Sequence, residues 1–180
     1  EMFLAASRLV ERFSPDDLRR ATTFSNLADL YRAQARYGDA DELYRRALEI
    51  LVATQGPEHP RVAVSLDNLA GFYSDQGWDA EAEPLYWRAI AILETTVGPE
   101  HLDVAASVAG LAAVYHRQGR FTEAEPLYQR VLRIYERTLD PENIRLAETL
   151  EAYAGLLRRT ERDTQALEME TRARAIRGGP

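Results

Sequence analysis

Apolar residues recur along the chain at the spacing of helices that bury one face. Between Val62 and Tyr73 they lie three or four positions apart, and a second stripe of the same kind runs from Ala82 to Leu93. This spacing predicts two amphipathic helices. Between them, Gly77 predicts the end of the first helix, and Asp79 is a suitable N-cap for the second. Because no stretch alternates polar and apolar residues, we expect an all-α fold.

The predicted helix pair repeats with a period of 42 residues. The tripeptide Asn26-Leu27-Ala28 returns at residue 68 and, in altered form, at residues 110 and 152. A block that begins at Leu43 and the linker Gly56-Pro57-Glu58-His59-Pro60 return with the same period. Three separate blocks that share one period predict an array of helical repeats rather than a single central core.

Small and aromatic residues recur in phase with the repeat. Helix axes approach closely only where the contact residues are small, and tyrosines can fill the space around them, so we predict a core from both types. The core positions are Ala28, Ala70, Ala112, Ala40, Ala82 and Ala124, with tyrosines at 31, 73, 115, 44, 86 and 128. Pro84 and Pro126 lie close to the predicted start of their helices, where a missing N–H costs least.

The amino-acid composition of the chain excludes several kinds of functional site. The 180-residue chain has no cysteine and no lysine, so all 22 basic residues are arginine. This excludes disulfides, thiolate metal sites, P-loop lysines and Schiff-base lysines. The net charge of −7 argues against nucleic acid as a partner, because counterion release needs a basic surface. No apolar run approaches the about 18 residues of a membrane span, so we expect no membrane partner and a cytoplasmic location.

Candidate catalytic residues are few. His59 and His101 are 42 residues apart, and a residue that recurs with the period is expected to serve the linker. His116 lies on a predicted first helix beside Arg117, where it is either a ligand contact or an exposed histidine without a role. The glutamates recur at helix starts, which favours a role in complementing the helix dipole. We therefore predict no catalytic residue, no metal site and no cofactor.

These blocks resemble the tetratricopeptide repeat. The pattern Asn-Leu-Ala-x-x-Tyr, the run Glu-Ala-Glu-Pro-Leu-Tyr, the linker Gly-Pro-Glu-His-Pro and the 42-residue period are similar to the kinesin-light-chain-like subtype. The resemblance implies a right-handed superhelical solenoid of antiparallel helix pairs, whose first helices line a concave groove. We expect repeats over residues 14–177, in units at about 18–55, 60–97, 102–139 and 144–177. Residues 1–13 are expected to be the second helix of a preceding partial repeat, and residues 178–180 a linker or an added tail.

The resemblance also implies that the concave face holds an extended peptide. In the family the asparagine before Leu-Ala contacts the peptide backbone, and here Asn26 and Asn68 match that motif, whereas Gly110 and Ala152 depart from it. Helical spacing adds polar residues to the same face. The candidate binding residues are Asn26, Asp29, Arg32, Asp67, Asn68, Asp75, His116, Arg117, Arg158 and Arg159.

The chemistry of these residues narrows the expected ligand. The family's carboxylate clamp for chaperone C-termini needs a lysine, which the chain lacks, so that ligand class is disfavoured. An acidic peptide fits Arg117, Arg158 and Arg159 through bidentate contacts. The competing interpretation is that Glu148 and Glu151 neutralise these arginines within the fold.

Three functional classes remain open. The first is a non-catalytic peptide-binding or protein-binding module, part of a larger protein. The second is a sensor or autoinhibitory arm of a multidomain signalling NTPase or effector. The third is a self-association scaffold that forms a homo-oligomer through a terminal helix or Trp87. Trp87 interrupts the periodicity and either anchors an interface or packs on a neighbouring repeat. Trp78 is expected to take over the packing of an aromatic residue that is missing at the next position.

Overall fold

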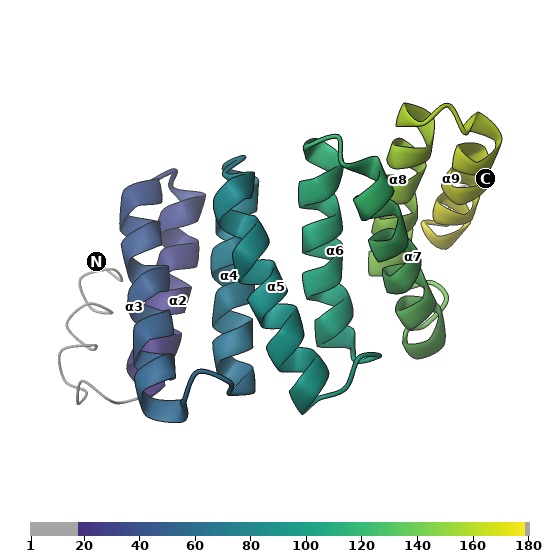
Figure 1. Ribbon diagram of the computed structural model, residues 1–180. Helices are drawn as coiled ribbons and strands as arrows, with labels where there is room; N and C mark the ends of the chain where they lie inside the picture. The colour runs from purple at the N-terminus through teal and green to yellow at the C-terminus, as the bar shows by residue number, and fades with distance from the viewer. Residues whose placement is uncertain (1–17, 179–180) are drawn as a thin grey trace. The chain divides into compact units, whose positions relative to one another are not determined.

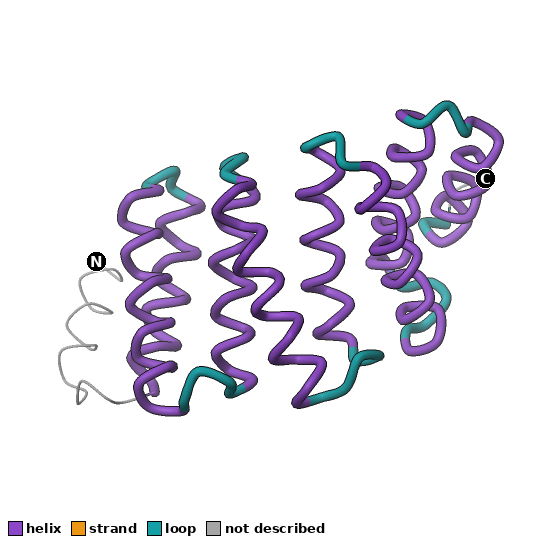
Figure 2. Tube along the Cα trace, viewed as in Figure 1, coloured by secondary structure: helices purple, strands orange, loops and turns teal. Residues whose placement is uncertain are grey.

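The structure, a computed structural model, describes residues 18–178. Every regular element in that range is an α-helix, and the helices form antiparallel pairs (Figure 1 and Figure 2). The pairs are α2 (Leu18–Ala33) with α3 (Tyr37–Gln55), α4 (Pro60–Asp75) with α5 (Asp79–Thr96), α6 (Leu102–Arg117) with α7 (Phe121–Thr138), and α8 (Ile144–Arg159) with α9 (Asp163–Ile176). The predicted all-α fold of helical repeats is confirmed.

The chain divides into two compact units, one up to Thr96 and the other from Val97 onward. In the first unit, α3 packs against both α2 and α4, and α4 packs against α5. In the second unit, α7 packs against both α6 and α8, and α8 packs against α9. Within each unit the second helix of one pair therefore joins that pair to the next. No helix in the described part of the chain is long and apolar enough to cross a membrane.

A three-residue turn joins the two helices of each pair. Gly77 has a φ of 73° at the end of α4, and the N–H of residue 78 donates to the Tyr73 carbonyl at 2.9 Å. Gly119 ends α6 in the same way with a φ of 74°. The predicted helix stop is therefore confirmed, because glycine accepts this left-handed backbone without steric cost. In the other two pairs the same conformation falls on Ala35, with a φ of 58°, and Glu161, with a φ of 61°.

The recurring linker histidines are helix N-caps. His59 Nδ1 accepts a hydrogen bond of 3.1 Å from the N–H of Arg61, and His101 Nδ1 accepts one of 3.2 Å from the N–H of residue 103. In the fourth pair Asn143 Oδ1 fills the same role at 3.0 Å. Each side chain satisfies a backbone donor that the first turn leaves free. The predicted structural role of His59 and His101 in the linker is confirmed.

The core consists of the recurring small and aromatic residues. The six predicted alanines, Ala28, Ala70, Ala112, Ala40, Ala82 and Ala124, are fully buried. Five of the six predicted tyrosines are buried as well, with only Tyr31 half-buried. Tyr31 belongs to the first described pair, and Arg36 lies over the face of its ring at 4.1 Å. The core prediction therefore holds apart from Tyr31.

Two details of the predicted helix starts are wrong. Asp79 is the first residue inside α5 rather than its N-cap, because the carbonyl of Trp78 already accepts the N–H of Ala82 at 3.1 Å. Pro84 and Pro126 are each the sixth residue of their helix, beyond the four free N–H groups of the first turn. Each proline therefore removes one intrahelical hydrogen bond. The turn at Gly77 is a Schellman turn, in which the N–H of residue 78 donates to the carbonyl of Tyr73. Helix α5 begins directly after this turn, at Asp79, and therefore earlier than the apolar stripe from Ala82 indicates.

Some predictions fall on residues that the structure does not describe. The expected helix of a preceding repeat, residues 1–13, lies outside the described range, as do residues 179 and 180 of the expected tail. The division into repeat units stays a prediction.

Candidate functional site

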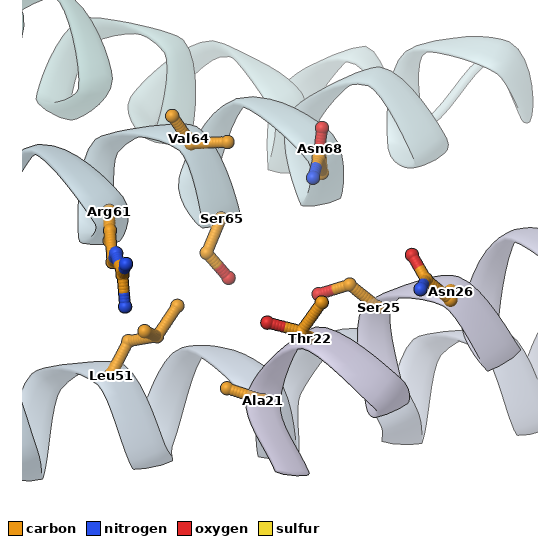
Figure 3. A pocket seen from close by; sticks show the side chains of 9 residues that line it. All are labelled: Ala21, Thr22, Ser25, Asn26, Leu51, Arg61, Val64, Ser65 and Asn68. Atoms are coloured by element: carbon orange, nitrogen blue, oxygen red, sulfur yellow. The ribbon is translucent and has the colours of Figure 1, made fainter. Parts of the chain in front are cut away.

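In the first unit, the first helices α2 and α4, together with Leu51 of α3, line an open pocket of about 360 Å³, which we call the α2–α4 pocket. Its lining residues are Ala21, Thr22, Ser25, Asn26, Leu51, Arg61, Val64, Ser65 and Asn68. Figure 3 shows Thr22 and Ser25 on α2 facing Ser65 on α4. The pocket combines hydroxyl and amide groups with apolar surface from Val64, which is 48% exposed.

Asn26 and Asn68 occupy the same position in consecutive helix pairs and line the same pocket. Both side chains are exposed, one on α2 and one on α4 (Figure 3). A carboxamide donates and accepts hydrogen bonds at once, which matches the N–H and C=O of a peptide bond. The structure therefore brings these two predicted residues together.

Three of the other four candidates in the first unit are engaged in contacts within the fold. The Tyr44 hydroxyl donates to the Asp29 carboxylate at 2.5 Å, and Arg32 forms an exposed ion pair of 3.0 Å with Asp75. Burial, with the Asp29 carboxylate as the second cause, raises the pKa of Tyr44, so this hydroxyl stays protonated. Asp67 is half-buried and outside the lining of the α2–α4 pocket.

In the second unit, α6, α7 and α8 line a pocket of about 400 Å³ that we call the His116 pocket. It is lined by Ala113, His116, Arg117, Gly119, Tyr128, Ala152 and Arg159. Three of the ten candidate residues, His116, Arg117 and Arg159, meet here. Helix α6 supplies the first two and helix α8 the third.

The His116 side chain is half-buried among aromatic and small residues. Its ring contacts Phe121 and Tyr128 edge-on, with centroid distances of 5.7 and 6.1 Å, and Nδ1 lies 3.4 Å from the Tyr128 hydroxyl. A Cβ at Gly155 would lie 3.4 Å from its Cε1 atom, so the imidazole also touches α8. His116 is therefore half-buried rather than exposed, and its role as a ligand contact stays a prediction.

Charge and burial keep this imidazole neutral. Burial lowers the pKa of His116 most, and the positive charges of Arg159 and Arg117 lower the pKa further. Burial also raises the pKa of Tyr128 to about 12, so its hydroxyl keeps its proton near neutral pH. The pocket therefore holds two guanidinium groups, one neutral imidazole and one hydroxyl.

The structure does not bring Arg158 to this pocket. Arg158 forms a bidentate ion pair with Glu170 of α9, at 2.7 and 2.9 Å, and lies 3.7 Å from Asp163. The competing interpretation named Glu148 and Glu151 as the groups that neutralise the three arginines. For Glu151 it is wrong, because Glu151 pairs with Arg177 at 2.9 Å, and Arg158 is instead neutralised by Glu170. Side chains of α9 thus take part in the charge balance, which helical spacing on α8 alone did not indicate.

A second pocket of about 350 Å³ adjoins the His116 pocket. The two share Ala113, Tyr128 and Ala152. The additional lining residues are Ala106, Ala109, Tyr135, Arg145, Glu148 and Thr149. The two pockets are therefore neighbours that share small residues and Tyr128, and each adds charged residues of its own, Arg117 and Arg159 in the first and Arg145 and Glu148 in the second.

The two tryptophans lie outside these pockets. Trp78 packs on Phe72 and Tyr73, with ring centroids 6.0 and 5.8 Å apart, which confirms that it takes over aromatic packing. The arginines at the equivalent positions, 36 and 120, instead place their guanidinium groups over a tyrosine ring at 4.1 and 3.8 Å. Trp87 is 48% exposed on α5.

The lining residues that sequence reasoning missed include Arg61 and Tyr128. Arg61 follows Pro60 at the start of α4, and its position in the α2–α4 pocket depends on how α4 lies against α2 and α3. Tyr128 was assigned to the core because it recurs with the period, yet its hydroxyl reaches the His116 pocket. A buried tyrosine hydroxyl needs a hydrogen-bond partner, and this rule could have placed it at the groove.

The described residues contain no cluster of three or more side chains suited to hold a metal ion. The repeated antiparallel helix pairs define a class of helical repeat protein, and the comparisons identify that class. The sequence pattern of the tetratricopeptide repeat matches residues 1–51, 19–95 and 103–178. The chain belongs to the tetratricopeptide repeat family. No curated protein shows a significant match.

Solved structures similar to the chain include tetratricopeptide proteins of the kinesin-light-chain type. BtubC (BKLC) from P. vanneervenii is 24% identical with a TM-score of 0.84, over 98% of this chain and 73% of that one. A putative kinesin light chain with nearly identical TPR-like repeats from Podosopora anserina is 27% identical with a TM-score of 0.76, over 96% of this chain and 82% of that one. The aspartyl phosphate phosphatase F of Bacillus subtilis shares the fold at 14% identity and a TM-score of 0.80, over 96% of this chain and 43% of that one.

These similarities confirm the kinesin-light-chain-like subtype that the sequence indicates. Tetratricopeptide repeats bind protein or peptide partners, and the fold is generally a non-catalytic interaction scaffold. The chain is accordingly a protein-interaction module.

Proposed function

We propose that the chain is a non-catalytic module that binds an extended peptide segment of a partner protein on the face formed by its first helices. The observation that carries the proposal is the pair Asn26 and Asn68, which are exposed, equivalent by repeat and part of one pocket. Two carboxamides on neighbouring first helices can bond two peptide groups of one extended chain. Such backbone contacts give affinity, while the pockets beside them select side chains.

The surroundings of the asparagines support a peptide rather than a small metabolite. The α2–α4 pocket is polar at Thr22, Ser25 and Ser65 and apolar at Val64 and Leu51, so it suits side chains of mixed character. The net charge of −7 disfavours nucleic acid, and we propose no nucleic-acid partner and a cytoplasmic location. Among residues 18–178 the linker histidines cap helices, and several charged side chains form ion pairs, which supports a role without catalysis.

A peptide-library screen tests this proposal. The wild type is expected to capture a set of peptides whose affinity falls about tenfold or more in the double variant Asn26→Ala/Asn68→Ala, because each lost carboxamide removes hydrogen bonds to the peptide backbone. Gln34→Ala, which removes an exposed carboxamide in the turn after α2, is the matched control and should bind as the wild type does. Undiminished capture by the double variant would refute the roles of Asn26 and Asn68.

A further inference from the structure

The His116 pocket concentrates positive charge in an otherwise acidic chain. Arg117 comes from α6 and Arg159 from α8, and both are exposed, while His116 lies half-buried between them. Among the described residues that line this pocket, none is a carboxylate. Because the whole chain carries a net charge of −7, any attraction to an anion at this place comes from these local groups.

The donors of the pocket lie on three helices and are held by packing. Phe121 supports the site, since its ring packs on His116 at 5.7 Å and the Arg159 guanidinium lies 5.9 Å from its centroid. In the described part of the chain Arg159 forms no ion pair, unlike its neighbour Arg158, which Glu170 holds. Tyr128 contributes a protonated hydroxyl 3.4 Å from the imidazole. An anion in the pocket can therefore meet guanidinium, imidazole and hydroxyl donors together.

We propose that the His116 pocket binds the phosphate group of a phosphorylated side chain on the partner peptide, an inference that rests on the peptide-binding function proposed above. A phosphate monoester carries a charge of about −1.5 to −2 near pH 7 and offers three strong acceptor oxygens. Two arginines and a protonatable histidine match that charge and number of acceptors. A carboxylate, with one charge and two oxygens, leaves part of this donor set unused.

The geometry links binding to proton uptake. In the empty pocket, burial and then the charges of Arg159 and Arg117 lower the pKa of His116. The remaining titratable group against the ring is Tyr128 of α7, which stays neutral, so the charged groups that act on the imidazole are the two arginines. A bound dianion offsets both guanidinium charges and raises the pKa of His116. Because the bound state holds the extra proton, proton uptake by His116 favours binding as the pH falls, until the phosphate monoester itself is protonated near pH about 6.

Inorganic phosphate is the first probe, read out through the imidazole resonances of the three histidines in the intact chain. We expect phosphate to raise the pKa of His116 relative to chloride at the same ionic strength, and to leave the linker histidines His59 and His101 unchanged. Arg159→Gln should weaken this response about tenfold, because a charge-assisted hydrogen bond is lost. Arg158→Gln, which removes a neighbouring arginine outside the pocket, should respond as the wild type does. A response equal at all three histidines, or equal in both variants, would overturn the phosphate site.

The source of the phosphate is tested with peptide pools that carry phosphoserine, glutamate or serine at one fixed position and are random elsewhere. The proposal expects the phosphoserine pool to be retained most strongly and Arg159→Gln to remove that preference. If the glutamate pool is retained as strongly as the phosphoserine pool, the pocket recognises an acidic side chain in general rather than a phosphate group, and the proposal is overturned. A response to free phosphate without preference for the phosphoserine pool would assign the pocket to a small phosphorylated molecule, which also contradicts it.

The two proposals can fail separately. If serine pools bind in an Asn26-dependent and Asn68-dependent manner while phosphoserine adds nothing, the peptide-binding module stands and the phosphate site falls. If no pool binds at all, the proposed function itself is contradicted. The variants concerned lie in different compact units, so one set of substitutions leaves the other pocket intact.

Discussion

Ala35 and Glu161 hold a backbone conformation that their side chains disfavour. Their φ angles are 58° and 61°, whereas the equivalent residues of the other two pairs are Gly77 and Gly119. In the left-handed region the Cβ of an ordinary residue crowds the carbonyl oxygen, at a cost of about 1–2 kcal/mol. The turn survives without glycine because the surrounding hydrogen bonds remain, such as that from Arg36 N to the Tyr31 carbonyl at 2.9 Å.

Replacing these two residues by glycine should stabilise the chain. Ala35→Gly and Glu161→Gly are each expected to raise the free energy of unfolding by about 0.5–1 kcal/mol, because the relief of steric strain exceeds the entropy that glycine adds to the unfolded state. Urea unfolding followed by circular dichroism measures the change. Gly77→Ala is the reciprocal variant and should destabilise by about 1 kcal/mol. Destabilisation by Ala35→Gly would show that no strain is stored at this turn.

At the scale of the element, α9 differs from the other second helices. Tyr44, Tyr86 and Tyr128 are buried on theirs, and the equivalent position on α9 is Glu170. Similarly, Arg177 follows α9 at the position of the buried Leu51. Glu170 and Arg177 form ion pairs with α8, to Arg158 and Glu151, and the Arg158 hydrogen bond lowers the pKa of Glu170. Charged pairs thus replace, at these two positions, the apolar residues that the other second helices bury.

Restoring the apolar stripe on α9 should create an adhesive surface. The double variant Glu170→Tyr/Arg177→Leu is expected to self-associate, since α9 then offers the packing face that α3 offers to α4, enlarged by the already exposed Leu167. Light scattering over a range of concentrations should show a higher apparent mass than the wild type has. Glu170→Gln breaks the same ion pair without adding apolar surface and should keep the wild-type mass. If the double variant also keeps the wild-type mass, the polarity of these positions does not control association through α9.

At the scale of the whole molecule, specific polar contacts couple one helix pair to the next. In the first unit, the Tyr73 hydroxyl of α4 donates to Asp41 of α3 at 2.5 Å and accepts from Arg45 at 2.5 Å. Burial and then the hydrogen bond to Asp41 raise the pKa of Tyr73 to about 12, so the bond persists across the neutral range. Stability of a repeat array depends on such interfaces between neighbours as well as on each repeat.

Removing the Tyr73 hydroxyl should weaken the coupling of adjacent pairs. Tyr73→Phe is expected to lower the free energy of unfolding by about 1 kcal/mol and to broaden the transition, because the interface between α3 and α4 loses hydrogen bonds that join two pairs. Tyr44→Phe is the matched control, since it deletes a hydroxyl bonded to Asp29 at 2.5 Å within one pair. The control should lose similar stability with an unchanged slope in urea. The same slope in both variants would contradict a coupling role for Tyr73.

Particular residues show how far the sequence could be interpreted. The periodic positions were assigned correctly almost throughout, as with the six core alanines, the stop at Gly77 and the structural histidines His59 and His101. The helix starts were less accurate, because Asp79 favours an N-cap by its chemistry while the turn geometry places it inside α5. At the boundary of a helix, several local conformational preferences compete, so a single residue is a weak signal. A period is a stronger signal, because the same pattern recurs in every repeat along the chain.

The sequence by itself determined the helices, their pairing and the family, because the 42-residue period repeats each local signal several times. It also placed Asn26 and Asn68 on one face. Only the tertiary structure decided which candidates meet: His116 lies with Arg159, while Arg158 pairs with Glu170 and Glu151 pairs with Arg177. The physical reason is that spacing fixes the direction of a side chain around its own helix, whereas its partners depend on how neighbouring helices pack.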